Sequence, residues 1–467
     1  MTTARPDTST APHHVTPDSA RPVAHFTARD TWLNDPNGLL YYKGVYHLYF
    51  QNNPFGSTWG NMSWGHATSA DLVTWTEQPV AIAATIDEMA FSGSAVVDTR
   101  NTAGFAAAGQ AALVAIYTRA LTAAPRDGEG SQAQALAYSL DDGTTWERYA
   151  GNPVLDIGSS EFRDPKVFWH GDDSGCWVMV AVEATNHRVV IYTSDNLISW
   201  TRRSHFGPAH ATGGVWECPD LFPLTISGTD EIRWVLVVSL NPGSIAGGSG
   251  TQYFVGDFDG STFTPEWLSP SEELASFDWL DFGRDYYAAV SFNSAPDGRR
   301  LMIGWASNWQ YANETPSSPW RSAMSLVREM GLRRCADGRL RVTQRPVVPA
   351  DSLDVGVYNI RVPSAPGERT EVILSSQDGV SRVVLMIDGD ERTVTCDRSR
   401  SGNVSFHTAF SSVDCAPMLT QASHVELTIV VDATVLEVYI DDGMATMTQQ
   451  IFPHSPLTQL SVEPICN

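Results

Sequence analysis

The sequence is poor in basic residues and has no long apolar run. Thirty Lys and Arg stand against 53 Asp and Glu in 467 residues, which gives a formal charge of −23 at pH 7. A surface this negative repels phosphate backbones and anionic membrane surfaces, so we expect neither nucleic acid nor a membrane as a partner. No stretch of about 18 apolar residues is available to cross a bilayer.

Cysteine is scarce, and its spacing carries no motif. The six cysteines form no C-x-x-C pair: Cys176, Cys218, Cys335, Cys396, Cys415 and Cys466. This pattern indicates neither a zinc site nor a disulfide framework, although a bridge between Cys396 and Cys415 stays open. The Gly-rich stretch Gly247-Gly-Ser-Gly250 lacks the lysine and helix start of a phosphate loop. We therefore expect no metal and no cofactor.

The N-terminus lacks the charged-then-apolar pattern of a signal peptide. Residues 1–24 are rich in Thr, Pro, Ala, Ser and Asp and have no periodic apolar positions, which predicts a disordered tail. As written, the chain is predicted to be cytoplasmic, and it is predicted to be secreted if a leader has been removed from it.

Aromatic residues, by contrast, are plentiful. They make up 10% of the chain and include 15 Trp and 14 Tyr. Such side chains stack on sugar faces, which favours a carbohydrate ligand, and they also pack between β-sheets. From residue 25 onward, short runs of β-branched and aromatic residues alternate with Gly, Asn, Asp and Pro. This alternation of short strand-forming runs and turn residues predicts an all-β protein with almost no helix.

A weak internal repeat refines the fold prediction. Residues 68–75, 138–146 and 192–200 each combine the end of a strand, an acidic turn and a Trp, and residues 254–263 resemble them with Phe in place of Trp. The repeated aromatic positions are 71, 54 and 63 residues apart, as expected for four-stranded propeller blades. We predict a five-bladed β-propeller, while noting that strand-turn-Trp hairpins recur in other β proteins.

The amino-acid composition of the chain changes near residue 335, where Arg and Pro become frequent. Beyond it, alternating segments such as residues 382–387 and 425–431 suggest two packed sheets. We predict a propeller over residues 25–337, a linker over 338–350 and a C-terminal β-sandwich over 351–467.

Three acidic residues stand in unusual local sequences. Asp35 lies in Trp32-Leu-Asn-Asp-Pro-Asn-Gly38, and Asp164 lies in Glu161-Phe-Arg-Asp-Pro165. Asp-Pro-Asn-Gly is also a strong turn former. A residue before proline is biased toward extended backbone, so Asp164 could point from a strand into a central cavity. A turn and a surface ion pair with Arg163 are the plain alternatives.

The third acidic residue is Glu217, in Trp216-Glu-Cys-Pro-Asp220. Its apolar, Gly-rich surroundings favour the protonated carboxyl that a general acid requires, or else a buried structural carboxyl. Three carboxylates from three blades suit glycoside cleavage, in which one acts on the sugar and another protonates the leaving oxygen.

Seven ordered motifs give the chain a strong resemblance to glycoside hydrolase family 32, and within it to the exo-acting inulinases and levanases. The resemblance runs from about residue 25 to the C-terminus. The motifs are Trp32-Leu-Asn-Asp-Pro-Asn-Gly38, Phe50-Gln-Asn-Asn-Pro54, Trp59-Gly-Asn-Met-Ser-Trp-Gly-His66, Phe91-Ser-Gly-Ser94, Phe162-Arg-Asp-Pro165, Trp216-Glu-Cys-Pro219 and Trp305-Ala-Ser-Asn-Trp309.

The resemblance implies a five-bladed propeller with a β-sandwich and gives the acids their roles. Asp35 would be the nucleophile, Glu217 the acid/base, and Asp164 would hold ring hydroxyls and stabilise the transition state. A retaining enzyme would hold Asp35 and Glu217 about 5 to 5.5 Å apart. The resemblance further implies substrate-binding roles for Asn34, Gln51, Trp59, Ser92, Arg163 and Trp309, and it implies that Cys218 tunes the acid.

The function that this implies is a retaining exo-acting β-fructosidase. It would hydrolyse terminal fructosyl units of inulin or levan, with sucrose as a possible further substrate, and we expect it to be a monomer. A fructosyltransferase and a levanbiose-releasing levanase would share every motif. The turn at residues 138–146 also matches sialidase propellers, an inverting arabinan-cleaving propeller also uses three acids, and a non-catalytic carbohydrate-binding propeller is the alternative outside enzymes.

Overall fold

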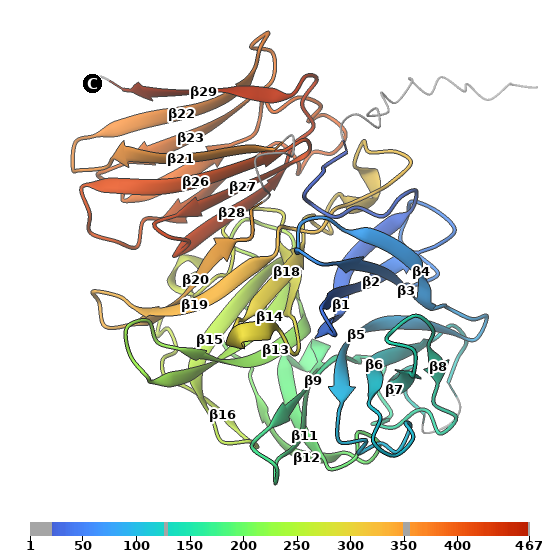
Figure 1. Cartoon of the computed structure of the whole chain (residues 1–467). Coiled ribbons are helices and arrows are strands. Elements are labelled where there is room, and N and C mark those ends of the chain that lie inside the picture. The colour runs from blue at the N-terminus through green and yellow to red at the C-terminus, as the bar shows by residue number, and fades with distance from the viewer. Residues whose placement is uncertain (1–20, 126–128, 349–354, 466–467) are drawn as a thin grey trace, which may run out of the picture.

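The computed structural model describes residues 21–125, 129–348 and 355–465. Its first twenty strands form five four-stranded antiparallel sheets, the blades of a propeller (Figure 1). Blades one and two are β1 (Trp32–Tyr42), β2 (Val45–Asn53), β3 (Ser63–Ser69), β4 (Thr76–Ile82), then β5 (Glu88–Asp98), β6 (Ala112–Leu121), β7 (Gln132–Ser139) and β8 (Glu147–Arg148). Blade three is β9 (Phe162–His170), β10 (Cys176–Glu183), β11 (Arg188–Ser194) and β12 (Thr201–Phe206).

The remaining blades complete the ring. Blades four and five are β13 (Val215–Thr225), β14 (Ile232–Asn241), β15 (Gly250–Phe258), β16 (Phe263–Pro265), then β17 (Tyr287–Ser291), β18 (Leu301–Trp305), β19 (Arg328–Arg334) and β20 (Leu340–Pro346). Short 3₁₀ turns interrupt the loops: η2 (Ala184–Asn186), η3 (Leu274–Ser276), η4 (Pro296–Gly298) and η5 (Ala312–Glu314).

The first strand of every blade lies at the propeller axis. β1, β5, β9, β13 and β17 contact one another in that order, and β17 contacts β1 again. Backbone hydrogen bonds close the ring, from Tyr41 N–H to the Asn293 carbonyl and from Leu33 N–H to the Arg321 carbonyl. Central strands such as β6 are buried on both faces because each blade packs between two neighbours. The predicted five-bladed propeller is confirmed.

The sequence repeat corresponds to one structural feature, the turn from the third to the fourth strand of blades one to four. In blade one the Asp71 carboxylate accepts hydrogen bonds from the N–H groups of Val73 and Thr74. Asp141, Asn196 and Asp259 accept equivalent backbone bonds in the next three blades. The short polar side chain therefore fixes the turn, and the following aromatic residue leads into the last strand.

The C-terminal part is a β-sandwich, as predicted. Its two sheets pack with alternating buried and exposed residues, most clearly on β22 and β23. The strands, in spatial order, are β21 (Gly356–Pro363), β26 (His424–Asp432), β27 (Val435–Ile440) and β28 (Ala445–Gln450) in one sheet, and β25 (Val413–Pro417), β24 (Thr393–Asp397), β23 (Arg382–Asp388), β22 (Arg369–Ser376) and β29 (Leu457–Pro464) in the other.

The propeller ends later in the structure than the sequence-based prediction places it. The predicted end at residue 337 falls in the turn between β19 and β20, and β20 occupies much of the predicted linker 338–350. The composition of this last strand resembles that of a linker because it contains Arg341, Gln344 and Arg345, although only Arg345 is exposed. Residues 349–354 lie outside the described residues, as does most of the predicted tail. Residues 21–24 are described, and Val23 and Ala24 donate hydrogen bonds to Asp432.

The open question of a Cys396–Cys415 bridge is also answered. Both cysteines are free, because β24 and β25 pair Cys396 with Asp414 and Thr395 with Cys415. Neighbouring residues of a strand face opposite sides, so the Cys396 thiol is buried while Cys415 is exposed.

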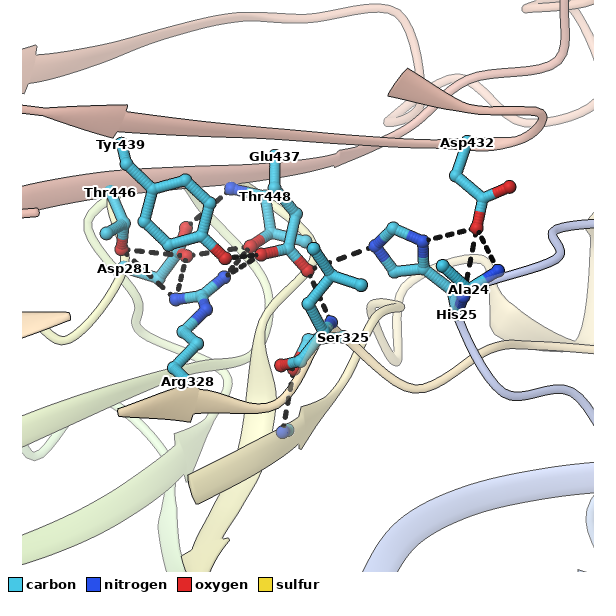
Figure 2. Close-up of polar contacts among 12 residues, drawn as sticks. Ala24, His25, Asp281, Ser325, Arg328, Asp432, Glu437, Tyr439, Thr446 and Thr448 are labelled. Carbon is cyan, nitrogen blue, oxygen red and sulfur yellow. Dashed lines mark hydrogen bonds and ion pairs between the residues drawn. The ribbon is translucent and has the colours of Figure 1, made fainter. Parts of the chain in front are cut away.

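A buried ionic cluster joins the sandwich to the propeller (Figure 2). Arg328 of β19 bonds to Asp281 at 3.0 Å and to Glu437 of β27 at 2.9 Å, and all three side chains are fully buried. His25, at the start of the propeller chain, lies between Asp432 at 2.8 Å and Glu437 at 3.2 Å. The cluster thus ties the N-terminal segment, the fifth blade and the sandwich together.

Candidate active site

One end of the propeller axis is hollowed into a pocket of about 330 Å³. Its lining contains all nine residues predicted to act in catalysis or binding, together with five others. The lining residues are Asn34, Asp35, Gln51, Trp59, Phe91, Ser92, Gln132, Glu161, Arg163, Asp164, Val215, Glu217, Asn241 and Trp309. Pockets of a few hundred Å³ suit sugar-sized ligands.

A β-bulge in each innermost strand shapes this end of the axis. The regular pairing is interrupted at Asp35 in β1, Ser92 in β5, Asp164 in β9, Cys218 in β13 and Ala288 in β17. A bulge adds one residue to a strand and turns its side chain away from the sheet. In three of these strands a proline follows the bulged residue, and proline cannot donate to the ladder. The bulges of β1, β5 and β9 therefore aim Asp35, Ser92 and Asp164 into one pocket.

Three of the bulged residues, Asp164, Cys218 and Ala288, have backbone with positive φ. Asp164 has φ of 60° and Cys218 has φ of 47°, values that favour glycine. Such conformations cost free energy and persist where the surrounding structure enforces them. Here the Cys218 N–H donates to the Asp164 carboxylate at 2.9 Å, so the two strained positions support each other.

Cys218 also links two of the carboxylates. Its thiol lies 3.6 Å from Asp35 Oδ2 and 3.7 Å from Asp164 Oδ2. Burial, followed by the charges of the carboxylates, raises the pKa of this thiol, so it keeps its proton as a donor. Asp35 accepts further hydrogen bonds from Ser92 Oγ at 2.8 Å and from Asn34 Nδ2 at 3.1 Å. These contacts fix the orientation of the Asp35 carboxylate.

The carboxylate of Glu217 accepts hydrogen bonds from an arginine and a tyrosine. Arg163 Nε donates to Glu217 Oε1 at 3.1 Å, and Tyr287 donates a very short hydrogen bond to Glu217 Oε2. Arg163 is itself oriented by Glu161 and Gln132. The arginine is buried and bridges pocket carboxylates, which excludes the surface ion pair considered from the sequence. The Glu217 side chain stays 22% exposed because it faces the open pocket.

The site is buried and carries more acids than cations, and both features raise the pKa values of Asp35 and Asp164. Burial, reinforced by the charge of Glu217, raises the pKa of Asp35 from 3.8 to about 6. Burial also raises the pKa of Asp164 to about 7, because the opposite charge of Arg163 offsets only part of the effect. Perturbed carboxylates clustered in a cleft are typical of catalytic sites.

Aromatic side chains form the apolar wall of the pocket. Trp309 stacks on Trp32 with ring centroids 6.0 Å apart and contacts Trp305. Trp59 is 43% exposed and packs edge-on against Phe91 at 6.1 Å. A sugar ring entering the pocket can therefore place its apolar face on aromatic carbon while its hydroxyls meet the carboxylates.

Sequence reasoning missed several residues that shape the site. Gln132, Glu161 and Asn241 line the pocket, and Tyr287 contacts Glu217 from behind. Glu161 had a weak signal, since it lies two residues before Arg163 and so shares its face of the chain. Tyr287 had none, because β17 carries no recognisable motif. In the described part of the chain, no three His, Cys, Asp or Glu side chains are arranged to hold a metal ion.

Comparison with protein-family models gives two matches that together span most of the chain. The model of the Glycosyl hydrolases family 32 N-terminal domain matches residues 25–346, and that of the Glycosyl hydrolases family 32 C terminal matches residues 350–464. The first match ends with β20, at the end of the fifth blade.

Individual proteins are similar over nearly the whole chain. A levanase of Bacillus subtilis is 43% identical over 93% of the chain, which covers 66% of that protein's length. An extracellular exo-inulinase of Aspergillus ficuum is 42% identical over 92% of the chain and 89% of its own length. The solved structure of an exo-inulinase from Aspergillus awamori superimposes with a TM-score of 0.85 at 37% identity, covering 97% of this chain and 96% of that one.

A further solved structure carries a ligand. It is a β-fructofuranosidase from Schwanniomyces occidentalis complexed with fructosyl-erythritol, with a TM-score of 0.83 at 34% identity, and it covers 98% of this chain and 96% of that one. Among the described residues, no helix is both long and apolar enough to span a membrane.

Proposed function

The chain belongs to glycoside hydrolase family 32, and from this premise we propose that it is a retaining exo-acting β-fructosidase of fructans. The observation that carries the proposal is the pocket in which Asp35, Asp164 and Glu217 meet beside an aromatic wall. The names of the levanase and the exo-inulinases that it resembles point to levan or inulin as the substrate class.

Asp35 acts as the nucleophile. Ser92, Asn34 and Cys218 donate hydrogen bonds to its carboxylate and hold it in one orientation. The carboxylate attacks the anomeric carbon of the terminal fructosyl unit while the bond to the leaving oxygen breaks. A covalent fructosyl-enzyme ester results.

Glu217 acts as acid and then as base. It gives its proton to the glycosidic oxygen as the shortened fructan leaves, and it then takes a proton from the water that attacks the ester. Fructose is released with its configuration retained, and Asp35 returns to the carboxylate. The hydrogen bonds from Arg163 and Tyr287 hold Glu217 in position through both steps.

Asp164 binds ring hydroxyls of the fructosyl unit. Its carboxylate is 6% exposed and faces the pocket from the bulge of β9, so a bound hydroxyl replaces water as its partner. Such hydrogen bonds strengthen as positive charge develops on the sugar ring in the transition state. Asn34, Gln51 and Ser92 contribute neutral polar contacts, and Trp59 and Trp309 cover the apolar face of the ring.

The test is product analysis. Purified protein is incubated with inulin, levan and sucrose, released sugars are followed by chromatography, and the anomer first released is identified by NMR. Fructose as the sole early product, formed as the β-anomer, is expected. Disaccharides would indicate a levanbiose-releasing enzyme, transfer products would indicate a fructosyltransferase, and the α-anomer would indicate inversion.

Two variants separate catalysis from binding. Asp35→Asn is expected to bind fructan and to release no sugar, whereas Asp142→Asn, a change of an exposed carboxylate, leaves activity unchanged. If the wild-type protein and Asp35→Asn both bind fructan and neither forms product, the proposal is wrong and the chain is a carbohydrate-binding propeller. The expected monomeric state and the cellular location remain predictions.

A further inference from the structure

A second cavity lies at the other end of the propeller axis and has the opposite charge. It has a volume of about 370 Å³, and three of its described lining residues are cations while none is Asp or Glu. The lining residues are Val96, Val97, Thr99, Arg100, Lys166, Phe168, Trp169, Trp177, Leu221, Pro223, Trp234, Asn293, Ser294 and Arg300. In a chain with a formal charge of −23, a cavity whose only charged lining residues are cations is unexpected.

The same innermost strands line the cavities at both ends of the propeller axis. β9 carries Asp164 into the active pocket and Phe168 into the second cavity, and β13 carries Glu217 and then Leu221. Four residues of extended chain span about 13 Å, so the two cavities are separate sites on one axis.

A buried cluster of polar residues, Lys166, Asp220 and Ser291, lies between the two cavities. Lys166 Nζ lies 3.2 Å from Asp220 Oδ2 and donates to the Ser291 carbonyl, and the Ser291 N–H donates to the same Asp220 oxygen at 2.6 Å. Asp220 is fully buried and faces Lys166 from within the protein. It therefore neutralises Lys166; of the other two cations, Arg100 pairs with the exposed Asp173 at 2.9 Å, and Arg300 has no carboxylate partner among the described residues.

Arg300 is the lining cation that has no carboxylate partner among the described residues; its guanidinium lies over the Phe222 ring, 5.1 Å from the centroid. Its side chain makes only long hydrogen bonds, to Ser291 Oγ at 3.3 Å and to the Phe292 carbonyl at 3.4 Å, and its Nε has no partner. Within the described residues Arg300 forms no ion pair, and the Asp220 carboxylate pairs with Lys166 instead, at 3.2 Å. Burial lowers the pKa of Arg300, and the charge of Asp220 offsets this only in part. A partly desolvated guanidinium without a carboxylate partner gains free energy from an anion.

The rest of the cavity offers a second cation and an apolar surface beside Arg300. Arg100 lies at the rim, stacked over Trp169 at 4.3 Å, and its partner Asp173 is fully exposed. Trp234 and Phe168 pack together with ring centroids 5.6 Å apart and supply an apolar wall. Guanidinium groups bind carboxylate and phosphate oxygens through paired N–H donors.

We propose that this cavity binds a small organic oxyanion, a molecule of about sugar size that carries carboxylate or phosphate groups. Its negative group lies against Arg300, with Arg100 closing from the rim, and its carbon skeleton lies on the aromatic wall. Because Arg100, Lys166, Pro223 and Arg300 come from blades two, three, four and five, the bound ligand also ties these blades together.

The experiment is isothermal titration calorimetry of the full chain at low salt, with citrate, inorganic phosphate and neutral glycerol as probes. Citrate or phosphate is expected to bind with a stoichiometry of one and to raise the melting temperature, and glycerol is not. Binding of citrate alone identifies a carboxylate ligand, and binding of phosphate alone identifies a phosphate ligand. Absence of binding by both anions overturns the proposal.

Three variants localise the site. Arg300→Met keeps the apolar stem and removes the charge, and it is expected to weaken anion binding by about tenfold or more. Arg100→Met, at the exposed rim, is expected to weaken it less. Arg361→Met, on the exposed face of β21, removes the same charge elsewhere and should leave binding unchanged. Equal affinity of wild type and Arg300→Met, or equal weakening by Arg361→Met, contradicts the site.

This inference stands apart from the proposed function. Saturating fructose, which occupies the opposite end of the axis, should not change the affinity for the anion, and Asp35→Asn should bind the anion as the wild type does. Fructan hydrolysis by Arg100→Met should remain at the wild-type rate. Loss of anion binding and loss of hydrolysis are therefore separate outcomes.

Discussion

Asp35 in the pocket and Glu437 beneath the sandwich are both withdrawn from water, yet their pKa values move in opposite directions. Burial and the charge of Glu217 raise the pKa of Asp35 to about 6. Burial also opposes ionisation of Glu437, but the charge of Arg328 and hydrogen bonds from His25 and Tyr439 outweigh it and lower the pKa to about 2. The difference lies in the partners and not in the depth of burial.

This contrast separates a reactive carboxylate from a structural one. In the interface cluster every carboxylate has a cation within hydrogen-bonding distance, and its remaining oxygens accept bonds from threonine hydroxyls and backbone N–H groups (Figure 2). In the pocket, Arg163 is shared by the carboxylates of Glu161, Asp164 and Glu217. An excess of buried negative charge weakens folding, and it is what a site that stabilises a cationic transition state requires.

The largest expected effect comes from removing a pocket carboxylate. Asp35→Asn should lower kcat/KM for fructan hydrolysis by about 10³-fold or more, because the nucleophile is lost. Its melting temperature should not fall, since a buried charge near Glu217 is removed. Asp432→Asn in the interface cluster should behave in the opposite way, with activity kept and the melting temperature lowered. Equal effects of the two variants on activity would remove the distinction.

The next effect concerns the interface cluster. Arg328→Met leaves Asp281 and Glu437 as buried, unpaired charges, so the free energy of unfolding should fall by about 3–5 kcal/mol. Denaturant unfolding measures this, and hydrolysis at low temperature should persist. Adding Glu437→Gln to Arg328→Met should recover part of the loss. Strictly additive losses would show that the two residues are not coupled.

A smaller effect is expected at alkaline pH. Burial opposes protonation of His25, but hydrogen bonds to Asp432 and Glu437 raise its pKa from 6.5 to about 9. A raised pKa means that its stabilising contribution is complete below pH 6.5 and is lost as the pH rises through about 9. The loss is at most about 3 kcal/mol. Melting temperatures of wild type and His25→Gln should therefore converge toward pH 9, and parallel curves would contradict this.

The smallest effect is expected in the acid limb of the pH profile of kcat/KM. Asp35 must be ionised to attack, so kcat/KM should fall by about tenfold per pH unit once the pH drops below the raised pKa of about 6. Because fructans are uncharged, this limb reports the free enzyme. A stopped assay on inulin across the acidic range measures it. A limb at the ordinary aspartate value of 3.8 would show that the pocket does not perturb Asp35.

Much of the fold could be predicted from the sequence because its signals are local. The Asp and Asn turns before Trp75, Trp146 and Trp200 specify the last hairpin of a blade through bonds within a few residues. The end of the fifth blade could not be predicted in this way. β20 is rich in Arg, and only its pairing with β19 identifies it as a strand.

The residues of the pocket could be named from motifs, because Asp-Pro and Glu-Cys-Pro are short and distinctive. By itself the sequence determined the blade turns, the all-β class and the acids that stand before or near proline. The tertiary structure alone decided which carboxylates share a cation, since Arg163 and Glu217 are 54 residues apart and Arg328 and Glu437 are 109 apart. A pKa depends on distances between such groups, and these distances are set by closing the ring of blades and by packing the sandwich against it.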